Sequence, residues 1–367
     1  MASSANMDEQ SDRLPEEMLK GLTHDSILIS KKDLVIGEEI GKGAFSRVYK
    51  GTYKGIPVAV KKQTISEENP EKFLMTELGV LHGVKHPNLI RYYGASFEGK
   101  EIFIITELMV GGELKQLLDK EDFKLPWKLR VRIARDIAAA ICYLHEQQLL
   151  HRDIKPDNVL IDDDWRPVLS DYGFARKRQT AAAMTICGTE EFMAPEMIWG
   201  EDYDERVDVF SFGMLLVEMI TGRRPGKHGW LERTPRNKFN FEMADLEAAI
   251  PPECPDSLTE CVKQCLAYEP DDRLDSDSML EWLQELYAEM EGDEAAPKPT
   301  DILGGAAIGS ASHADAQAKA AQDAVAAAVA GQGTAGGSSA FASKLAPRRP
   351  AFKPSLGGVG EASVIEE

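Results

Sequence analysis

The chain lacks an excess of positive charge. Its 367 residues include 42 Lys and Arg against 61 Asp and Glu, which gives a formal net charge of −19 at pH 7. A surface of this sign repels the phosphates of nucleic acids and the headgroups of anionic lipids. We therefore expect a protein that binds neither nucleic acid nor anionic membrane surfaces.

Long apolar runs are also missing. Residues 1–20 are acidic and polar, and no segment of the chain reaches the length of apolar sequence that a membrane helix needs. A secretory signal would require an apolar stretch near the N-terminus. The sequence therefore predicts no membrane insertion, and we expect a cytoplasmic protein.

Cysteine is scarce and irregularly spaced. The five cysteines are odd in number and show no disulfide framework, which favours a reducing compartment. Cys261 and Cys265 lie four positions apart on a predicted helix, where they form either a metal-binding pair or two core-facing thiols. Core-facing thiols are the preferred interpretation.

Two short polar clusters dominate what is present. His151–Asn158 reads His-Arg-Asp-Ile-Lys-Pro-Asp-Asn, and Asp171 follows thirteen positions after Asn158. Short apolar runs between these clusters predict buried strands, so the polar residues should lie on neighbouring loops. Asp153, Asn158 and Asp171 should therefore converge. Oxygen ligands of this type suit Mg²⁺ with substrate phosphates, and a remaining carboxylate can accept a hydroxyl proton, which indicates phosphoryl-transfer chemistry.

The order of predicted elements indicates two lobes. Strands come first and helices later, with Gly111 and Gly112 at the change, which is typical of an α+β fold. Strands are predicted at 34–40, 58–62, 89–93 and 102–106, with a hairpin turn at 51–55. Helices are predicted at 71–84, 129–146, 207–221, 258–266 and 276–290.

Composition divides the chain into three parts. We expect a polar leader at 1–33, a folded domain at 34–290 and a largely disordered tail at 291–367, which is rich in Ala, Gly and Ser. Within the tail, Lys344–Pro350 fits a polyproline ligand for an SH3-type partner. The same segment is also compatible with a plain solvated linker.

Five motifs together resemble eukaryotic protein kinases. They are the His-Arg-Asp cluster, Asp171-Tyr172-Gly173, Gly41-x-Gly43, the strand Val58-Ala59-Val60-Lys61 and the Ala-Pro-Glu that ends at Glu196. The resemblance covers roughly 34–290. It implies a two-lobed kinase fold that binds ATP and Mg²⁺ and phosphorylates a protein substrate, most simply as a monomer.

The resemblance also implies residue roles. Asp153 would be the catalytic base and Lys155 would lie near the transferred phosphate, while Asn158 and Asp171 would bind the metal. Lys61 would contact the phosphates and pair with Glu77. The implied nucleotide site comprises Ile40, Gly41, Gly43, Val48, Ala59, Lys61, Thr106, Glu107, Met109, Asn158, Leu160 and Asp171, with adenine bound through the backbone of Glu107 and Met109.

Two positions depart from the family pattern. Ser46 stands where the third glycine of the phosphate loop is expected, and Tyr172 replaces the usual phenylalanine. These two residues favour a pseudokinase scaffold that binds nucleotide without turnover. The remaining catalytic residues are all in place and favour an enzyme, and the Ala-Pro-Glu segment argues against a small-molecule kinase.

Finer placement rests on local similarity. Lys155 and the pair Gly188-Thr189 resemble serine/threonine kinases, although dual specificity remains open. The segment 104–112 and Trp282-Leu283 look like the tyrosine-kinase-like group. The segment 233–255 is loosely similar to the LIM-kinase and testis-specific-kinase branch.

Regulation and support are implied at a few further residues. Arg152 places a permanent cation beside the catalytic loop, where it would attract a phosphate on the activation segment. Thr185 is the preferred acceptor and Thr180 the second. Glu196 is expected to pair with Arg273, and Asp208 to anchor the catalytic loop.

Overall fold

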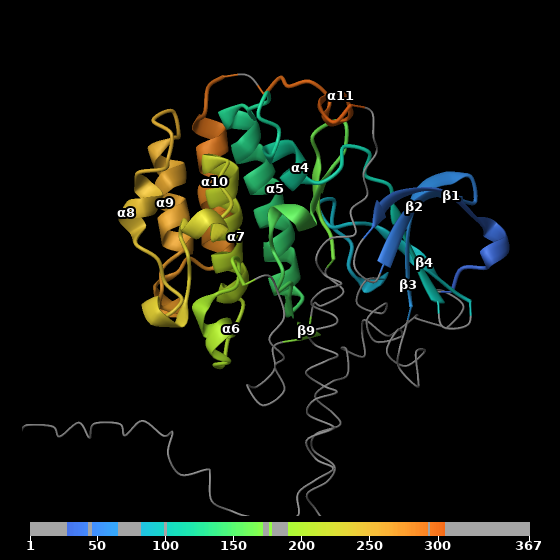
Figure 1. Cartoon of the computed structure of the whole chain (residues 1–367), viewed down its shortest axis with the longest axis horizontal. Helices are drawn as coiled ribbons and strands as arrows, with labels where there is room; N and C mark the ends of the chain where they lie inside the picture. Colours follow the sequence, from blue (N-terminus) through green and yellow to red (C-terminus); the bar gives the residue numbers. More distant parts are fainter. Residues whose placement is uncertain are drawn as a thin grey trace, which may run out of the picture. The chain divides into compact units, whose positions relative to one another are not determined.

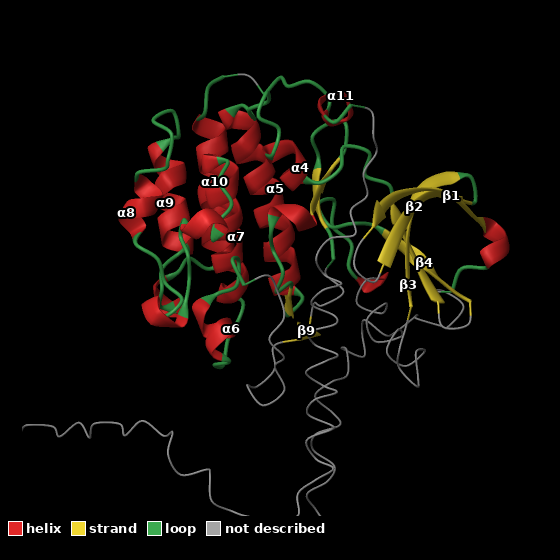
Figure 2. Cartoon of the chain, in the orientation of Figure 1, coloured by secondary structure: helices red, strands yellow, loops and turns green. Residues whose placement is uncertain are grey.

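The structure is a computed structural model that describes residues 28–42, 46–64, 82–98, 101–171, 176–177, 190–292 and 294–304. Element labels follow Figure 1. Figure 2 shows the larger strands gathered on one side of the described chain and the helices on the other. The predicted α+β architecture with two lobes is therefore confirmed.

A five-stranded antiparallel sheet forms the first lobe, with strand order β1-β2-β3-β5-β4. Its strands are β1 (Leu34–Lys42), β2 (Ser46–Tyr53), β3 (Ile56–Thr64), β4 (Tyr92–Glu98) and β5 (Glu101–Glu107). The turn between β2 and β3 is only two residues long, because Lys54 and Gly55 both have positive φ, at 49° and 81°. A two-residue turn of this kind matches the twist of the paired strands.

Strand β3 divides its side chains between two faces. Val58 and Val60 are fully buried, and they form the core of this lobe with Ile29, Leu34, Phe103 and Ile105. Because side chains alternate along a strand, Ala59 and Lys61 face the opposite side. Lys61 therefore lies on the face of the sheet turned away from this core.

The predicted strand at 89–93 is wrong at its start. Strand β4 begins at Tyr92, and the preceding residues pair with β8 instead: Ile90 N donates to Leu169 O (3.0 Å) and Leu169 N donates to Asn88 O (2.8 Å). The first residues of the apolar run contact the second lobe and the later ones belong to the sheet of the first lobe. A local apolar pattern cannot tell these two environments apart. The helix predicted at 71–84 lies almost wholly outside the described residues.

The second lobe is helical, with α5 and α7 at its core. Every residue from Val207 to Ile220 on α7 is buried, and α5 packs against α10. The α-helices are α4 (Leu114–Leu118), α5 (Trp127–Glu146), α6 (Pro195–Trp199), α7 (Arg206–Thr221), α8 (Met243–Glu247), α9 (Asp256–Cys265), α10 (Ser276–Glu289) and α11 (Pro299–Ile302). The four predicted helices of this lobe are confirmed to within two residues at each end.

Short elements complete this lobe. They are the strand pairs β6 (Leu149–Leu150) with β9 (Arg176–Lys177) and β7 (Val159–Ile161) with β8 (Pro167–Leu169), and the 3-10 helices η2 (Pro156–Asn158), η5 (Lys227–Gly229), η6 (Pro235–Asn237) and η7 (Pro270–Asp272). Cys261 and Cys265 are fully buried on α9, as expected for core-facing thiols. None of the described helices combines the length and the apolar character that a bilayer crossing requires.

The packed chain extends beyond both expected boundaries. Ile29 is buried and its N–H donates to Ala95 O (2.7 Å), so the fold begins before Leu34. Residues 294–304, here called the C-terminal strap, pack on the helical lobe. Packing against the helical lobe therefore continues past Met290. The remainder of the tail, including Lys344–Pro350, lies outside the described residues.

The strap is held by both polar and apolar contacts. Trp165 Nε1 donates to Pro297 O (3.0 Å), and Thr300 Oγ1 donates to Asp163 Oδ1 (2.7 Å). Pro299 is buried, and a Cβ added at Gly111 would lie 2.7 Å from the Pro299 Cβ. Glycine is therefore required where the strap crosses the link between the lobes.

Removing the strap should destabilise the domain. A chain ending at Gly292 loses the buried Pro299 and the ion pair between Glu294 and Arg132 (2.7 Å), whereas a chain ending at Gly304 keeps them. We expect the melting temperature of the shorter chain to be lower by about 5 °C or more. Differential scanning calorimetry of both chains measures the difference. Equal melting temperatures would show that the strap contributes nothing to stability.

Candidate active site

The register of the sheet gathers the predicted nucleotide residues. Gly41 pairs with Val48 and Val48 with Lys61, while Ala59 pairs with Thr106 on β5. Directly paired residues lie on the same face of a sheet. Val48, Lys61, Ala59 and Thr106 therefore share the face turned away from the core of the first lobe. Two further residues of the predicted site, Ile40 on β1 and Leu160 on β7, are half-buried.

An ion pair connects this face to the second lobe. Lys61 Nζ lies 3.1 Å from Asp171 Oδ1, although the two residues are 110 positions apart. Asp171 adopts a positive φ of 58°, which costs energy for a residue other than glycine. Strain of this kind is characteristic of functional sites. The structure therefore brings together Lys61 and Asp171, two residues of the implied nucleotide site.

The catalytic loop forms a buried polar cluster. Lys155 Nζ and Asn158 Nδ2 each donate to Asp153 Oδ2 at 2.8 Å, and Asn158 Nδ2 also donates to the Asp153 carbonyl (2.7 Å). Lys155 and Asn158 are fully buried. Two donors thus bind one carboxylate oxygen of Asp153. They fix the orientation of the carboxylate group.

A buried carboxylate on α7 holds this loop. Asp208 accepts hydrogen bonds from the backbone N–H of His151 (2.8 Å) and of Arg152 (2.7 Å), and His145 Nε2 lies 3.0 Å away. Burial favours the neutral acid, but the hydrogen bonds and the nearby imidazoles keep the pKa of Asp208 below its usual value. Arg152 has a φ of 68°, so Asp208 stabilises a strained turn. The predicted anchoring role is confirmed.

His151 links the loop to the segment that carries Asp171. Its Nδ1 accepts from the Asp153 N–H (3.2 Å), so Nε2 carries the proton and donates to Ser170 O (2.9 Å). Complete burial lowers the pKa of His151, which keeps the ring neutral. The ring therefore sets the spacing between the two acidic loops.

The donor set fits a divalent cation. Asn158 Oδ1 is buried and has no hydrogen-bond partner among the described residues, and the Asp171 carboxylate remains partly exposed. Amide and carboxylate oxygens are the ligands that hard cations prefer. An orphaned buried oxygen costs free energy unless a ligand satisfies it.

A second buried ion pair holds the Ala-Pro-Glu motif that ends at Glu196. Arg273 Nη1 and Nη2 donate to the two carboxylate oxygens of Glu196 at 2.6 and 2.9 Å. Glu196 lies on α6, directly after Pro195. The predicted pairing of Glu196 with Arg273 is confirmed, and the contact is bidentate.

Comparison with known families agrees with this geometry. Residues 34–285 match the family model described as "Protein kinase domain". The chain belongs to the protein kinase family. Members of this family use ATP with a divalent metal and act on protein substrates.

Individual relatives are serine/threonine kinases by name. A "probable serine/threonine-protein kinase" of Dictyostelium discoideum is 40% identical over 256 residues, 68% of this chain and 60% of the relative. The "probable serine/threonine-protein kinase kinX" of the same organism is 37% identical over 287 residues, 75% of this chain and 25% of the relative. The chain thus spans between a quarter and three fifths of the length of these two relatives.

Several predicted kinase residues lie outside the described part of the chain. They are Gly43 of the phosphate loop, Glu77, Tyr172, and the threonines Thr180, Thr185 and Thr189. Arg152 is described and buried beside Asp153.

One buried acidic residue near the two acidic loops was not predicted from the sequence. Glu113 directly follows Gly111 and Gly112. It is buried and forms an isolated antiparallel β-bridge with Leu160. Burial, and then the charges of Asp157 and Asp171, raise its pKa to about 8. Its Oε1 has no hydrogen-bond partner among the described residues. The signal in the sequence was an acidic residue placed immediately after two glycines.

Glu113 should make stability fall as pH rises. Its pKa is about 8 in the folded state against 4.5 in the free residue, so the folded state retains a proton that the unfolded chain has lost between these values. Raising the pH from 5 to about 9 therefore costs stability through this group. Glu113→Gln removes this contribution, and its melting temperature should fall less over the same range.

The matched control for this titration is Glu281→Gln, at an exposed glutamate on α10. Its melting curve against pH should parallel that of the wild type. Parallel curves for Glu113→Gln and the wild type would contradict the raised pKa.

Proposed function

We propose that the protein is a serine/threonine protein kinase that transfers the γ-phosphoryl group of Mg·ATP to a hydroxyl of a protein substrate. The observation that supports this best is the buried cluster of Asp153, Lys155 and Asn158, placed on the loop that Asp208 holds. The ion pair of Lys61 with Asp171 adds the second half of the site.

Each residue has a role that follows from its position. Asp153 orients the acceptor hydroxyl and takes its proton, because one oxygen is fixed by two donors and the carboxylate cannot rotate freely. Lys155 offsets the negative charge that gathers near the transferred group. Lys61 holds the phosphates of the nucleotide, with Glu77 as its proposed partner on the following helix.

Asn158 and Asp171 would hold Mg²⁺. When bound, the ion neutralises phosphate charge. Ile40, Gly41, Gly43, Val48, Ala59, Thr106, Glu107, Met109 and Leu160 are the proposed remainder of the nucleotide site.

Two features favour the alternative of a scaffold that binds nucleotide without turnover. Ser46 replaces a loop glycine and is buried at the start of β2, and Tyr172 replaces phenylalanine. The hydrogen-bonded catalytic cluster has no use in a scaffold, because buried charges cost free energy that a binding surface need not spend.

Finer assignments rest on the sequence features described above. We place the chain in the tyrosine-kinase-like group, near the LIM-kinase and testis-specific-kinase branch, with dual specificity as the alternative. A cytoplasmic monomer and an SH3-type partner for Lys344–Pro350 complete the proposal.

Activation should depend on Thr185. A phosphate at this position would be attracted by Arg152, and each new charge-assisted hydrogen bond would help to order the segment. Thr185→Ala should lower kcat several-fold, whereas Thr180→Ala, in the same segment, should lower it less. Arg152→Ala should weaken the response to phosphorylation. Full activity of Thr185→Ala or of dephosphorylated protein would overturn this assignment.

Turnover should require both acidic loops. Asp153→Asn and Asp171→Asn should each lower kcat by about 100-fold or more with the melting temperature preserved, since they remove the base and a metal ligand. Asp245→Asn, at an exposed residue on α8, is the matched control. Activity is measured with labelled ATP and a peptide library, and phosphoamino-acid analysis identifies the acceptor. Near-normal turnover of Asp171→Asn would overturn the site, and phosphotyrosine alone would overturn the acceptor class.

A further inference from the structure

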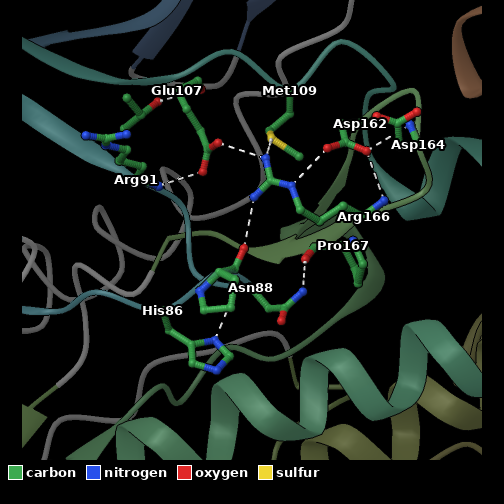
Figure 3. Close-up of polar contacts among 11 residues, drawn as sticks. His86, Asn88, Arg91, Glu107, Met109, Asp162, Asp164, Arg166 and Pro167 are labelled. Carbon is green, nitrogen blue, oxygen red and sulfur yellow. Dashed lines mark hydrogen bonds and ion pairs between the residues drawn. The ribbon is translucent and has the colours of Figure 1, made fainter.

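One arginine contacts both lobes beside residues 106–109, here called the hinge. Arg166 lies in the turn between β7 and β8, and Figure 3 shows its guanidinium at the centre of a polar network. Nη1 donates to Pro87 O (2.9 Å), which belongs to the loop before β4. Nη2 donates to Glu107 Oε2 (2.9 Å) and lies 3.7 Å from Met109 Sδ. All three nitrogens are used, because Nε donates to Asp162 Oδ2 (2.9 Å).

Glu107 carries this contact into the first lobe. Its second carboxylate oxygen, Oε1, accepts from the Arg91 N–H (2.9 Å), and its own N–H donates to Arg91 O (2.9 Å). The carboxylate thus bridges Arg91 and Arg166 (Figure 3). The end of β5 is fixed on both sides by these bonds.

The turn that carries Arg166 is itself fixed. Asp162 Oδ1 accepts from the backbone N–H of Asp164 and of Arg166, both at 2.9 Å. The C-terminal strap holds the same turn through Trp165 and Asp163. The guanidinium is therefore presented from a rigid base.

The two hinge side chains that end on Arg166 belong to Glu107 and Met109. These are the residues whose backbone groups are proposed to bind adenine, so a change at Arg166 would act on the nucleotide through them. A planar guanidinium contacts several acceptors in one fixed geometry, which an ammonium cannot reproduce. Small displacements of a binding backbone weaken ligand affinity strongly.

Exposure indicates where the contribution of Arg166 should be measured. The side chains of Arg166 and Glu107 are 37% and 19% exposed. Ion pairs at this exposure add little to global stability, because water screens them. The network should therefore affect the geometry of the hinge more than the melting temperature.

We propose that Arg166 is a positioning residue that aligns the hinge backbone at Glu107 and Met109 and so sets the affinity for the adenine nucleotide. This inference rests on the proposed ATP-binding function. It assigns to the β7–β8 turn a role in nucleotide affinity, although the turn supplies no atom to the reaction.

Replacing Arg166 should separate KM from kcat. Arg166→Ala should raise KM for ATP and Kd for Mg·ADP by about 3- to 10-fold, because the hinge must be ordered on binding. The value of kcat at saturating ATP and the melting temperature should change little. Steady-state kinetics, isothermal titration calorimetry and thermal melting provide these measurements.

Three further variants test the geometry. Arg166→Lys keeps the charge but not the fork, so its KM should remain raised, and full recovery would overturn the proposal. In Glu107→Gln an acceptor for Arg91 remains, and its effect on Kd should be non-additive with that of Arg166→Ala. Lys263→Ala breaks an exposed ion pair with Glu247 on the far helices and should leave KM and Kd unchanged.

The outcomes distinguish this proposal from the proposed function. Suppose that the wild type turns over ATP and that Arg166→Ala has an unchanged KM for ATP or a higher kcat/KM. This result overturns the positioning role alone. A wild type that binds Mg·ADP without turnover overturns the enzyme assignment, while a weakened Kd in Arg166→Ala still supports positioning. A wild type that binds no nucleotide overturns both.

Discussion

The described site depends on one buried carboxylate. Asp208 lies inside α7, a helix whose residues are buried from Val207 to Ile220, and it accepts the backbone N–H groups of His151 and Arg152. A buried charge is tolerated only where donors surround it. The backbone N–H groups of the strained turn at Arg152 stabilise the Asp208 carboxylate, and the carboxylate in turn holds the turn in place. Together they fix Asp153 against the helical core.

Beside the apolar contact of Leu89 and Ile90 with β8, polar contacts that carry little stability also join the two lobes. Lys61 reaches Asp171, and Arg166 reaches Glu107 and Pro87, in each case across a large separation in sequence. Partly exposed pairs of this kind contribute modestly to folding but define distances and directions. We infer that stability comes mainly from the apolar clusters, while these polar contacts set the geometry of the site.

Much of this was accessible from the pattern of residues. The alternation in β3 and the helical periodicity of α5, α7, α9 and α10 predicted those elements closely, because their buried faces repeat locally. The start of β4 was misplaced, since Leu89 and Ile90 are apolar for contacts with β8 rather than for the sheet. The strap was missed because it lies at the start of the Ala-, Gly- and Ser-rich tail and buries only a few side chains, such as Pro299, which form no periodic pattern.

The sequence by itself predicted which chemical groups should gather, namely Asp153, Lys155, Asn158, Asp171 and Lys61, together with the pairing of Glu196 with Arg273 and the anchoring by Asp208. Only the tertiary structure decided that Glu113 is buried among other acids and that Arg166 joins the hinge to the β7–β8 turn. The reason is physical. Short motifs carry the catalytic groups, and the long-range roles of Glu196, Arg273 and Asp208 were implied by the family resemblance. Burial, a raised pKa and a shared guanidinium have no local motif, because they arise from segments that meet only when the chain has folded.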